Sequence, residues 1–165
     1  MDLQQLDVLT GWSTWRVIDV GEYKNIRDLR NALTEARIET SRWTRDILKR
    51  VKISKDPRAL SLISLLQINL GFSAPQTYDE ICARASQLGL EFCPAEAGPI
   101  LRLLYRDQPA GERTVIAMMP IPDSENHPDI FALNRRADRL RLDAEDGSAA
   151  SVWPLNVRFV FASPN

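Results

Sequence analysis

The spacing of hydrophobic positions divides the chain into two parts with different patterns. Between residues 25 and 98, apolar residues recur every three or four positions, which is typical of amphipathic helices. From residue 99 to residue 162, short apolar runs rich in β-branched and aromatic residues alternate with turn-forming stretches, which is typical of strands. Because the helices precede the strands instead of alternating with them, the pattern predicts an α+β fold.

About four helices are predicted in the first of these parts, most of them after a polar residue that can cap the first turn. The third begins at Asp56-Pro57, and its apolar residues surround most of its circumference, so it is predicted to be the central buried helix. The fourth begins with the capping box Thr77-Tyr78-Asp79-Glu80. Gly98-Pro99 is predicted to break any further helix. The predicted helices span residues 25–37, 42–52, 57–70 and 77–88.

One short strand is predicted near the start of the chain, over residues 15–20, and the others follow Pro99. The connections between the later strands are too short for parallel crossovers, which predicts antiparallel neighbours. The expected architecture is therefore an N-terminal strand and about four helices, followed by a mainly antiparallel sheet of four to five strands. The later predicted strands span residues 100–105, 114–119, 129–134, 139–143 and 157–162.

The chain has 165 residues, of which 44% are hydrophobic and 26% charged, as in an ordinary globular protein. This length favours a single domain, with residues 1–14 as a possible flexible lead-in. The start lacks the basic and apolar regions of a signal peptide, and the most apolar stretch, residues 60–72, is too short and too polar to span a bilayer. The two cysteines suggest no disulfide framework. We therefore expect a cytoplasmic protein without membrane contact.

Charge is distributed unevenly, although the formal net charge is only −1. Residues 24–58 contain eleven Lys and Arg against five Asp and Glu, whereas residues 76–165 contain nine against thirteen. The basic stretch raises the alternative of a nucleic-acid-binding domain. Acidic residues interrupt the stretch, as is typical of ordinary solvated helix faces. The candidate contacts for nucleic acid are Arg42, Arg45, Lys49 and Arg50.

Residues 88–99, which read LGLEFCPAEAGP, form the most distinctive run of the chain. Together with Leu101-Arg102-Leu103 and Tyr105, this run resembles a family of small uncharacterised bacterial proteins. The resemblance covers residues 15–161 and is diffuse outside the central run. It implies a bacterial cytoplasmic domain, and no activity comes with it.

Three residues near the predicted junction between helices and strands are candidates for binding. Arg102 is expected on one face of a strand, where a guanidinium fork can bind a carboxylate or phosphate. It can equally pair with a structural acid such as Glu96 or Asp143. Glu96 and Tyr105 are the weaker candidates beside it.

The chain has four tryptophans, and two of them suggest a partner. Trp15 and Trp43 are predicted to pack in the core. Trp12 and Trp153 lie in loop-like stretches, where an exposed tryptophan can anchor a protein interface. Because no catalytic constellation stands out, the leading hypothesis is a non-enzymatic module that binds another protein.

A small enzyme is the second alternative, and it requires Cys93, Glu96, Arg102 and His127 to converge in one cleft. Cys93 and His127 form the only available thiol–imidazole pair. The glycine-rich phosphate loops, the GxSxG motif, the HExxH motif and zinc-type Cys/His spacings are all absent from the sequence, so no cofactor and no metal are expected.

Residues 123–129 place oxygen- or nitrogen-bearing side chains at alternate positions, as a calcium loop does. Pro128 stands where such a loop needs glycine, and the closing glutamate is missing. A solvated turn between strands is therefore the favoured interpretation. Whether this loop binds a cation is left open by the sequence.

Overall fold

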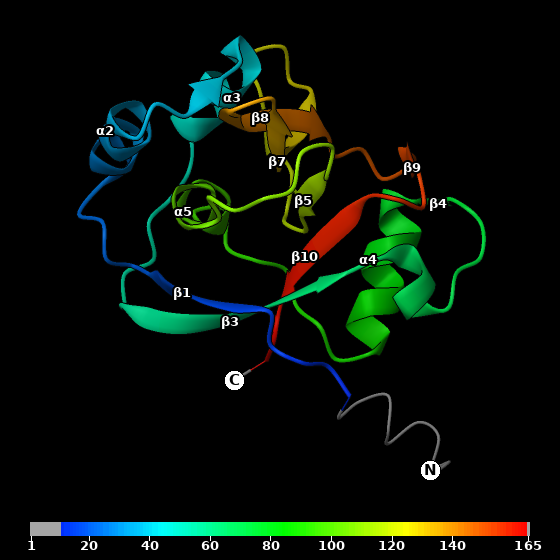
Figure 1. The fold of residues 1–165 in the computed structure, drawn as a ribbon. Helices are drawn as coiled ribbons and strands as arrows, with labels where there is room; N and C mark the ends of the chain where they lie inside the picture. The colour runs from blue at the N-terminus through cyan, green and yellow to red at the C-terminus, as the bar shows by residue number, and fades with distance from the viewer. Residues whose placement is uncertain (1–10, 165) are drawn as a thin grey trace.

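The computed structural model describes residues 11–164, which build one large mixed sheet, a two-stranded sheet and four α-helices (Figure 1). The strands are β1 (Arg16–Val20), β2 (Glu39–Thr40), β3 (Arg58–Leu65), β4 (Gln76–Thr77), β5 (Thr114–Ile116), β6 (Ile121–Pro122), β7 (Pro128–Arg136), β8 (Arg139–Asp146), β9 (Val152–Trp153) and β10 (Arg158–Ala162). The helices are α2 (Ile26–Glu35), α3 (Arg42–Leu48), α4 (Tyr78–Gln87) and α5 (Ala97–Leu104), and a 3-10 turn, η1, covers Gln67–Leu70.

The large sheet has eight strands in the order β1-β3-β10-β5-β7-β8-β2, with β6 paired to the end of β7. Most neighbours are antiparallel, but β10 runs parallel to β5 and β2 runs parallel to β8. Strands β4 and β9 pair separately. The α+β class is confirmed, while the expectation of four to five strands is wrong. The count is higher because β1, β2 and β3, from the first half of the chain, join the same sheet.

The predicted central helix over residues 57–70 is wrong, because this segment forms strand β3 and the short turn η1. Strand β3 lies between β1 and β10, and four of its residues from Leu60 to Leu65 are at most 2% exposed. A strand covered on both faces has a continuous apolar pattern that resembles a buried helix. Gly71 ends η1 with a left-handed φ of 91°.

Helix α5 occupies residues that were predicted to break a helix and then form a strand. Pro99 falls in its first turn, where the missing N–H has no intrahelical partner to lose. Gly98 lets the helix approach strand β7 closely, since a Cβ added there would stand 2.8 Å from the Phe131 Cβ. Figure 1 shows α5 enclosed between β1 and β3 on one side and β7 and β8 on the other, so the sheet curves around this helix.

The other helix starts agree with the expected caps. Asn25 accepts a hydrogen bond from the Asp28 N–H at the start of α2, and Ser41 accepts one from the Thr44 N–H at the start of α3. Thr77 and Glu80 form the predicted capping box of α4. The Glu80 N–H donates to the Thr77 hydroxyl at 3.2 Å, and the Thr77 N–H donates to the Glu80 carboxylate at 3.1 Å. These three starts depend on local hydrogen bonds, which explains why the local sequence predicts them.

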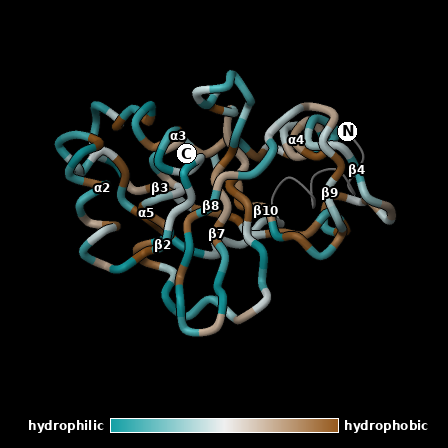
Figure 2. The backbone as a smooth tube through the Cα atoms, turned by 90° about the horizontal axis from the view of Figure 1, so that it is seen from above, coloured by the Kyte–Doolittle hydropathy of each residue, from teal (hydrophilic) through white to brown (hydrophobic). Residues whose placement is uncertain are grey.

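The core lies between the curved sheet and helix α5. Figure 2 shows hydrophobic residues concentrated around β10 and α5, with hydrophilic residues in the outer loops. Phe131, Phe159 and Phe161 are at most 1% exposed. Among residues 11–164, no helix is long and apolar enough to cross a membrane. Most of the predicted lead-in, residues 1–10, lies outside the described residues.

Candidate functional site

Arg102 is on a helix and fully buried, whereas the sequence placed it on a strand face. Its guanidinium donates to the Gln108 side-chain oxygen at 2.6 Å, to the main-chain carbonyl of Tyr105, and to the carbonyls of Asn134 and Arg141. Burial lowers the pKa of Arg102 to about 10, so the group stays charged at neutral pH. With 0% exposure, Arg102 joins α5 to the β7–β8 hairpin and cannot reach a surface ligand.

Glu96 is also completely buried, at the N-cap position of α5. One carboxylate oxygen accepts the Gly21 N–H at 3.1 Å and the other accepts the Ser54 N–H at 2.8 Å. The carboxylate therefore holds the loop after β1 and the loop before β3 against α5. Glu96 does not pair with Arg102, contrary to one alternative from the sequence, and both of its oxygens are used for structure.

Tyr105 ends α5 and is 6% exposed. Its hydroxyl donates to Glu112 over 2.6 Å, and its ring packs edge-on against Trp15 with centroids 5.0 Å apart. Burial and the hydrogen bond to Glu112 raise the pKa of Tyr105 above its usual value. Like Arg102 and Glu96, Tyr105 is engaged inside the protein.

The thiol–imidazole pair expected for an enzyme does not form. Cys93 is 3% exposed, and its thiol donates to the Val160 carbonyl at 3.5 Å. Burial raises the pKa of Cys93 to about 12, which keeps the thiol protonated and unreactive. His127 instead contacts carboxylates through both ring nitrogens. The four residues of the enzyme hypothesis therefore contact different partners and not one another. They are Cys93, Glu96, Arg102 and His127.

The two tryptophans proposed as anchors are covered to different degrees. Trp153 belongs to β9, is 3% exposed and packs edge-on against Phe159, so its assignment to an exposed loop is wrong. Trp12 is half-buried and packs on the core, and its indole N–H donates to the Leu88 carbonyl at 3.2 Å. Trp15 and Trp43 are also half-buried instead of fully buried. The tryptophans therefore give little support to an interface.

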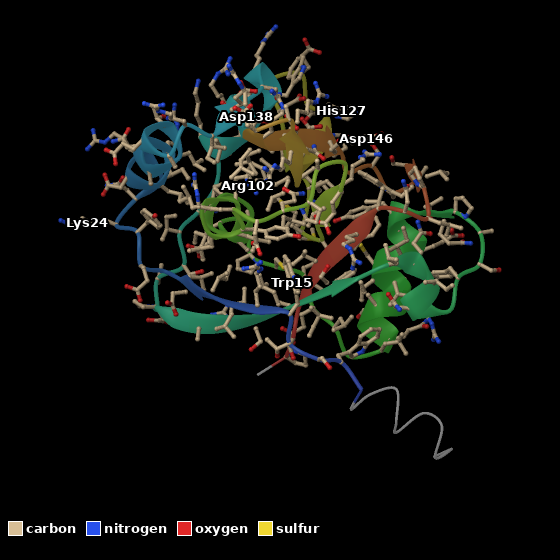
Figure 3. All side chains as sticks on the ribbon, in the orientation of Figure 1. Trp15, Lys24, Arg102, His127, Asp138 and Asp146 are labelled. Atoms are coloured by element: carbon tan, nitrogen blue, oxygen red, sulfur yellow. The ribbon has the colours of Figure 1, made fainter. Side chains whose placement is uncertain are left out.

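Arginines line two neighbouring depressions of the surface. The larger, about 540 Å³, is bounded by the segments that follow α2 and α5 and by the β7–β8 hairpin. The second, about 330 Å³, lies between α2 and α3. The segment of residues 36–40 borders both. Figure 3 shows many nitrogen-tipped side chains on this side of the molecule, around α2 and α3. We call these depressions the arginine basins. The larger is lined by Arg37, Arg106, Arg135 and Arg139 with Glu39 and Asp138, and the smaller by Arg27, Arg30 and Arg45.

The arginines of the larger basin are held to different extents. Arg139 is paired with Glu39, and Arg135 donates to the carbonyls of Ala137 and Gln108. Arg37 and Arg106 are exposed and belong to none of the ion pairs among residues 11–164. The basin therefore combines two guanidiniums held by hydrogen bonds or an ion pair with two that belong to no ion pair among the described residues.

Only one of the four basic residues predicted on the second helix lines a basin. Arg45 does so, while its guanidinium donates to the Thr40 carbonyl at 2.9 Å. Arg42 stacks over the Trp43 ring, and Arg50 donates to the carbonyls of Pro122 and Asp123. Lys49 is exposed and lines neither basin. A basic surface is therefore present, but apart from Arg45 the arginines that line it are not those predicted from the sequence.

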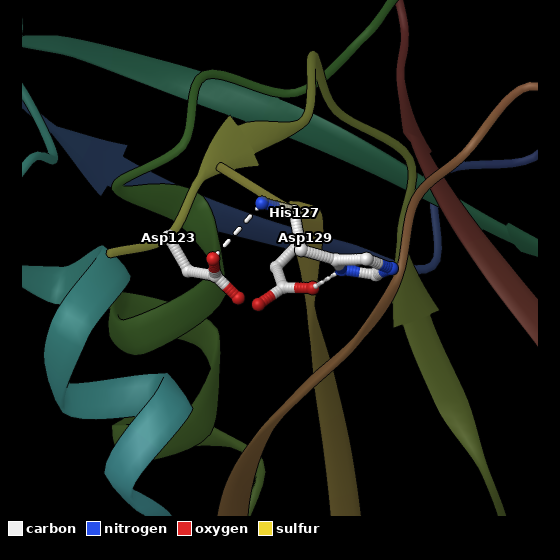
Figure 4. Close-up of side chains that lie close together, drawn as sticks. All are labelled: Asp123, His127 and Asp129. Carbon is white, nitrogen blue, oxygen red and sulfur yellow. Dashed lines mark hydrogen bonds and ion pairs between the residues drawn. The ribbon is translucent and has the colours of Figure 1, made fainter. Parts of the chain in front are cut away.

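The turn between β6 and β7 holds a second polar cluster, shown in Figure 4. It consists of Asp123, His127 and Asp129, whose ligand-type atoms all lie within 4.8 Å of one another. Burial raises the pKa of Asp129, and the neighbouring Asp123 carboxylate adds to this rise. The hydrogen bond to Asp129 raises the pKa of His127. The sequence identified this loop but favoured a solvated turn, whereas Asp123 and Asp129 are each only 5% exposed.

Comparison of the chain with protein families, curated proteins and solved structures finds no match. The resemblance to a family of small bacterial proteins therefore stays a prediction. Function has to be argued from the arginine basins and the polar cluster themselves.

The sequence missed the four arginines of the larger basin. They come from three separate parts of the chain, and Arg139 lies 100 residues from its partner Glu39. The local charge count could not find them, because residues 76–165 are acidic overall. The dipeptide Arg135-Arg136 close before Arg139 was the only available signal.

Proposed function

We propose that this protein binds nucleic acid through the phosphate backbone, using the two arginine basins. The observation that carries the proposal is the lining itself, which contains seven arginines against only Glu39 and Asp138. The whole chain has a net charge of −1, so this concentration of positive charge is local. A local positive surface on a nearly neutral protein attracts a polyanion to one side of it.

All seven basic residues of the lining are arginines, and this favours phosphate as the ligand group. The planar guanidinium presents paired N–H donors that match two oxygens of a phosphate. Two basins that share the border of residues 36–40 also suit a ligand with repeated phosphates better than a single small anion. Contacts of this kind position a backbone without reading its sequence.

An interaction module for another protein, the leading hypothesis from the sequence, has less support. It relied on exposed tryptophans, but Trp153 is buried and Trp12 is half-buried. An acidic protein would also be attracted to the arginine basins. The proposal is therefore tested against an acidic polypeptide as competitor.

The proposal is tested by fluorescence anisotropy with labelled single-stranded RNA, single-stranded DNA and duplex DNA. Replacing Arg27, Arg30 and Arg45 together by Gln should weaken binding at least about tenfold at low salt, because three phosphate contacts are lost. The matched control replaces Lys49, Lys52 and Lys55 by Gln, which removes three exposed cations outside both basins. Equal weakening by both triple variants, or stronger binding of poly-glutamate than of nucleic acid, contradicts the proposal.

A further inference from the structure

Asp123, His127 and Asp129 form a compact cluster at the β6–β7 turn and line neither arginine basin. The two aspartates are each 5% exposed, whereas the His127 side chain is 49% exposed. Burying two carboxylates side by side is unfavourable unless a positive charge or a proton compensates them. We propose that this cluster is a binding site for a divalent first-row transition-metal ion of the Zn²⁺ type.

The orientation of the two carboxylates supports this proposal. One oxygen of Asp123 accepts the N–H groups of Glu125 and His127, both at 2.9 Å, and one oxygen of Asp129 contacts the His127 Nδ1 at 2.7 Å. Figure 4 shows that the remaining oxygen of each aspartate faces the other. Two like-charged oxygens are thus turned toward one point, which a cation can occupy.

The imidazole of His127 is held in a position suited to a metal ligand. Its Nδ1 lies 2.7 Å from an Asp129 oxygen, and its Nε2 lies 3.5 Å from an Asp146 oxygen on the neighbouring strand β8. A histidine that binds a metal through one nitrogen commonly directs the other toward a carboxylate, which fixes the ring. Asp146 is in a different element from the turn, so this support does not arise from the geometry of the loop.

The donor set indicates the class of ion. One imidazole nitrogen with two carboxylate oxygens suits Zn²⁺ and its first-row neighbours, whereas Mg²⁺ and Ca²⁺ prefer oxygen ligands only. Protein ligands bind Zn²⁺ at about 2.0–2.2 Å, so neighbouring ligand atoms around one ion stand roughly 3–3.5 Å apart. The contact between His127 and Asp129 must open by only a fraction of an ångström to meet this spacing.

The cluster is accessible from solvent through a depression of about 300 Å³, which Trp43, Glu125, Ala144 and Glu145 also border. No lysine or arginine belongs to this lining, although Arg113 pairs with Glu145 at its edge and Arg50 donates to the main-chain carbonyl of Asp123. The local charge therefore favours entry of a cation, and three protein ligands leave coordination positions for water.

The test uses the single histidine of the chain, whose proton NMR signals need no mutagenesis to assign. Zn²⁺ added to the metal-free protein at neutral pH should shift the His127 ring signals and saturate at one equivalent, while Mg²⁺ at the same concentration should leave them unchanged. Unchanged His127 signals at ten equivalents of Zn²⁺ would overturn the proposal.

Variants then assign the ligands by isothermal titration calorimetry. Asp129→Asn and His127→Gln should each weaken Zn²⁺ binding at least tenfold, and circular dichroism checks that each variant is folded. Glu125→Gln is the matched control, because Glu125 is an exposed residue of the same turn outside the ligand set. Loss of binding in Glu125→Gln as large as in Asp129→Asn would contradict the assignment of these ligands, as would retention of full affinity in His127→Gln.

Discussion

Arg102 donates a hydrogen bond of 2.6 Å to the side-chain oxygen of Gln108, and both side chains are completely buried. Gln108 in turn donates to the main-chain carbonyls of Leu133 and Glu112. This relationship links α5 to the turn end of the β7–β8 hairpin, next to Arg135 and Arg139 of the larger basin. Arg102 therefore supports the hairpin that carries part of the larger basin but does not line the basin itself.

Replacing Arg102 by Met should destabilise the protein. Burial of the charge is unfavourable, but the loss of donors to Gln108 and the Tyr105 carbonyl leaves two buried acceptors unsatisfied, at about 1–3 kcal/mol each. We expect a net decrease of about 2–3 kcal/mol in the free energy of unfolding, measured by chemical denaturation. Arg106→Met, an exposed arginine after the same helix, should change it by less than about 0.5 kcal/mol. Equal stability of Arg102→Met and the wild type would contradict this role.

Glu96→Gln should also destabilise the fold, although glutamate and glutamine side chains have the same shape. Each Glu96 oxygen accepts one main-chain N–H, from Gly21 and Ser54, and an amide can accept only one of these bonds. The expected cost is about 1–3 kcal/mol, measured by the same denaturation. The exposed Glu91 provides the control, because Glu91→Gln should have little effect on stability. A stable Glu96→Gln variant would show that these hydrogen bonds contribute little.

Gly98→Ala should be destabilising even though alanine favours helices. The added Cβ would stand 2.8 Å from the Phe131 Cβ, so α5 and β7 must move apart. Overpacking of this kind costs about 1–3 kcal/mol, which exceeds the helix-propensity gain of about 1 kcal/mol. Thermal unfolding of this variant beside Leu104→Ala, whose side chain is 53% exposed on the same helix, measures the difference. A melting temperature equal to or above that of the wild type would refute the close packing of α5.

Neither cysteine should react readily in the folded protein. Burial raises the pKa of both Cys82 and Cys93 to about 12, whereas an unfolded thiol has a pKa of about 8.5. At pH 8 the native thiolate fraction is therefore roughly 1 in 10,000, and reaction with a disulfide reagent should be at least about a hundredfold slower than in denaturant. Both thiols should titrate after unfolding. Rapid labelling of Cys93 in the native state would revive the enzyme hypothesis.

Local hydrogen bonding determined which parts of the fold could be predicted. The caps at Asn25, Ser41 and Thr77 involve residues three positions apart, so the sequence contains the whole signal. The sequence pattern of strand β3 resembles that of a helix because both of its faces carry buried residues, such as Leu62 and Ile63. Helix α5 was mistaken for a strand because the need for Gly98 arises only from its contact with Phe131.

For the candidate sites too, the sequence predicts the features that depend on residues close together in the chain. The loop around Asp123 and His127 was found because its residues are close in sequence, but the support from Asp146 comes from another strand. Arg102 was chosen for its chemistry, yet its partners show a structural role. The larger arginine basin combines residues from the segment after α2, the segment after α5 and the β7–β8 hairpin, a set that only the tertiary fold assembles.

The salt dependence of nucleic-acid binding tests the central claim most directly. If about five guanidiniums of the two basins contact phosphates, a plot of log K against log salt for single-stranded nucleic acid should have a slope of about −3.5. The variant with Gln at positions 27, 30 and 45 should reduce the steepness by about 2, since three contacts disappear. Absence of binding at low salt, or an identical slope for the wild type and this variant, would contradict the proposed use of the arginine basins.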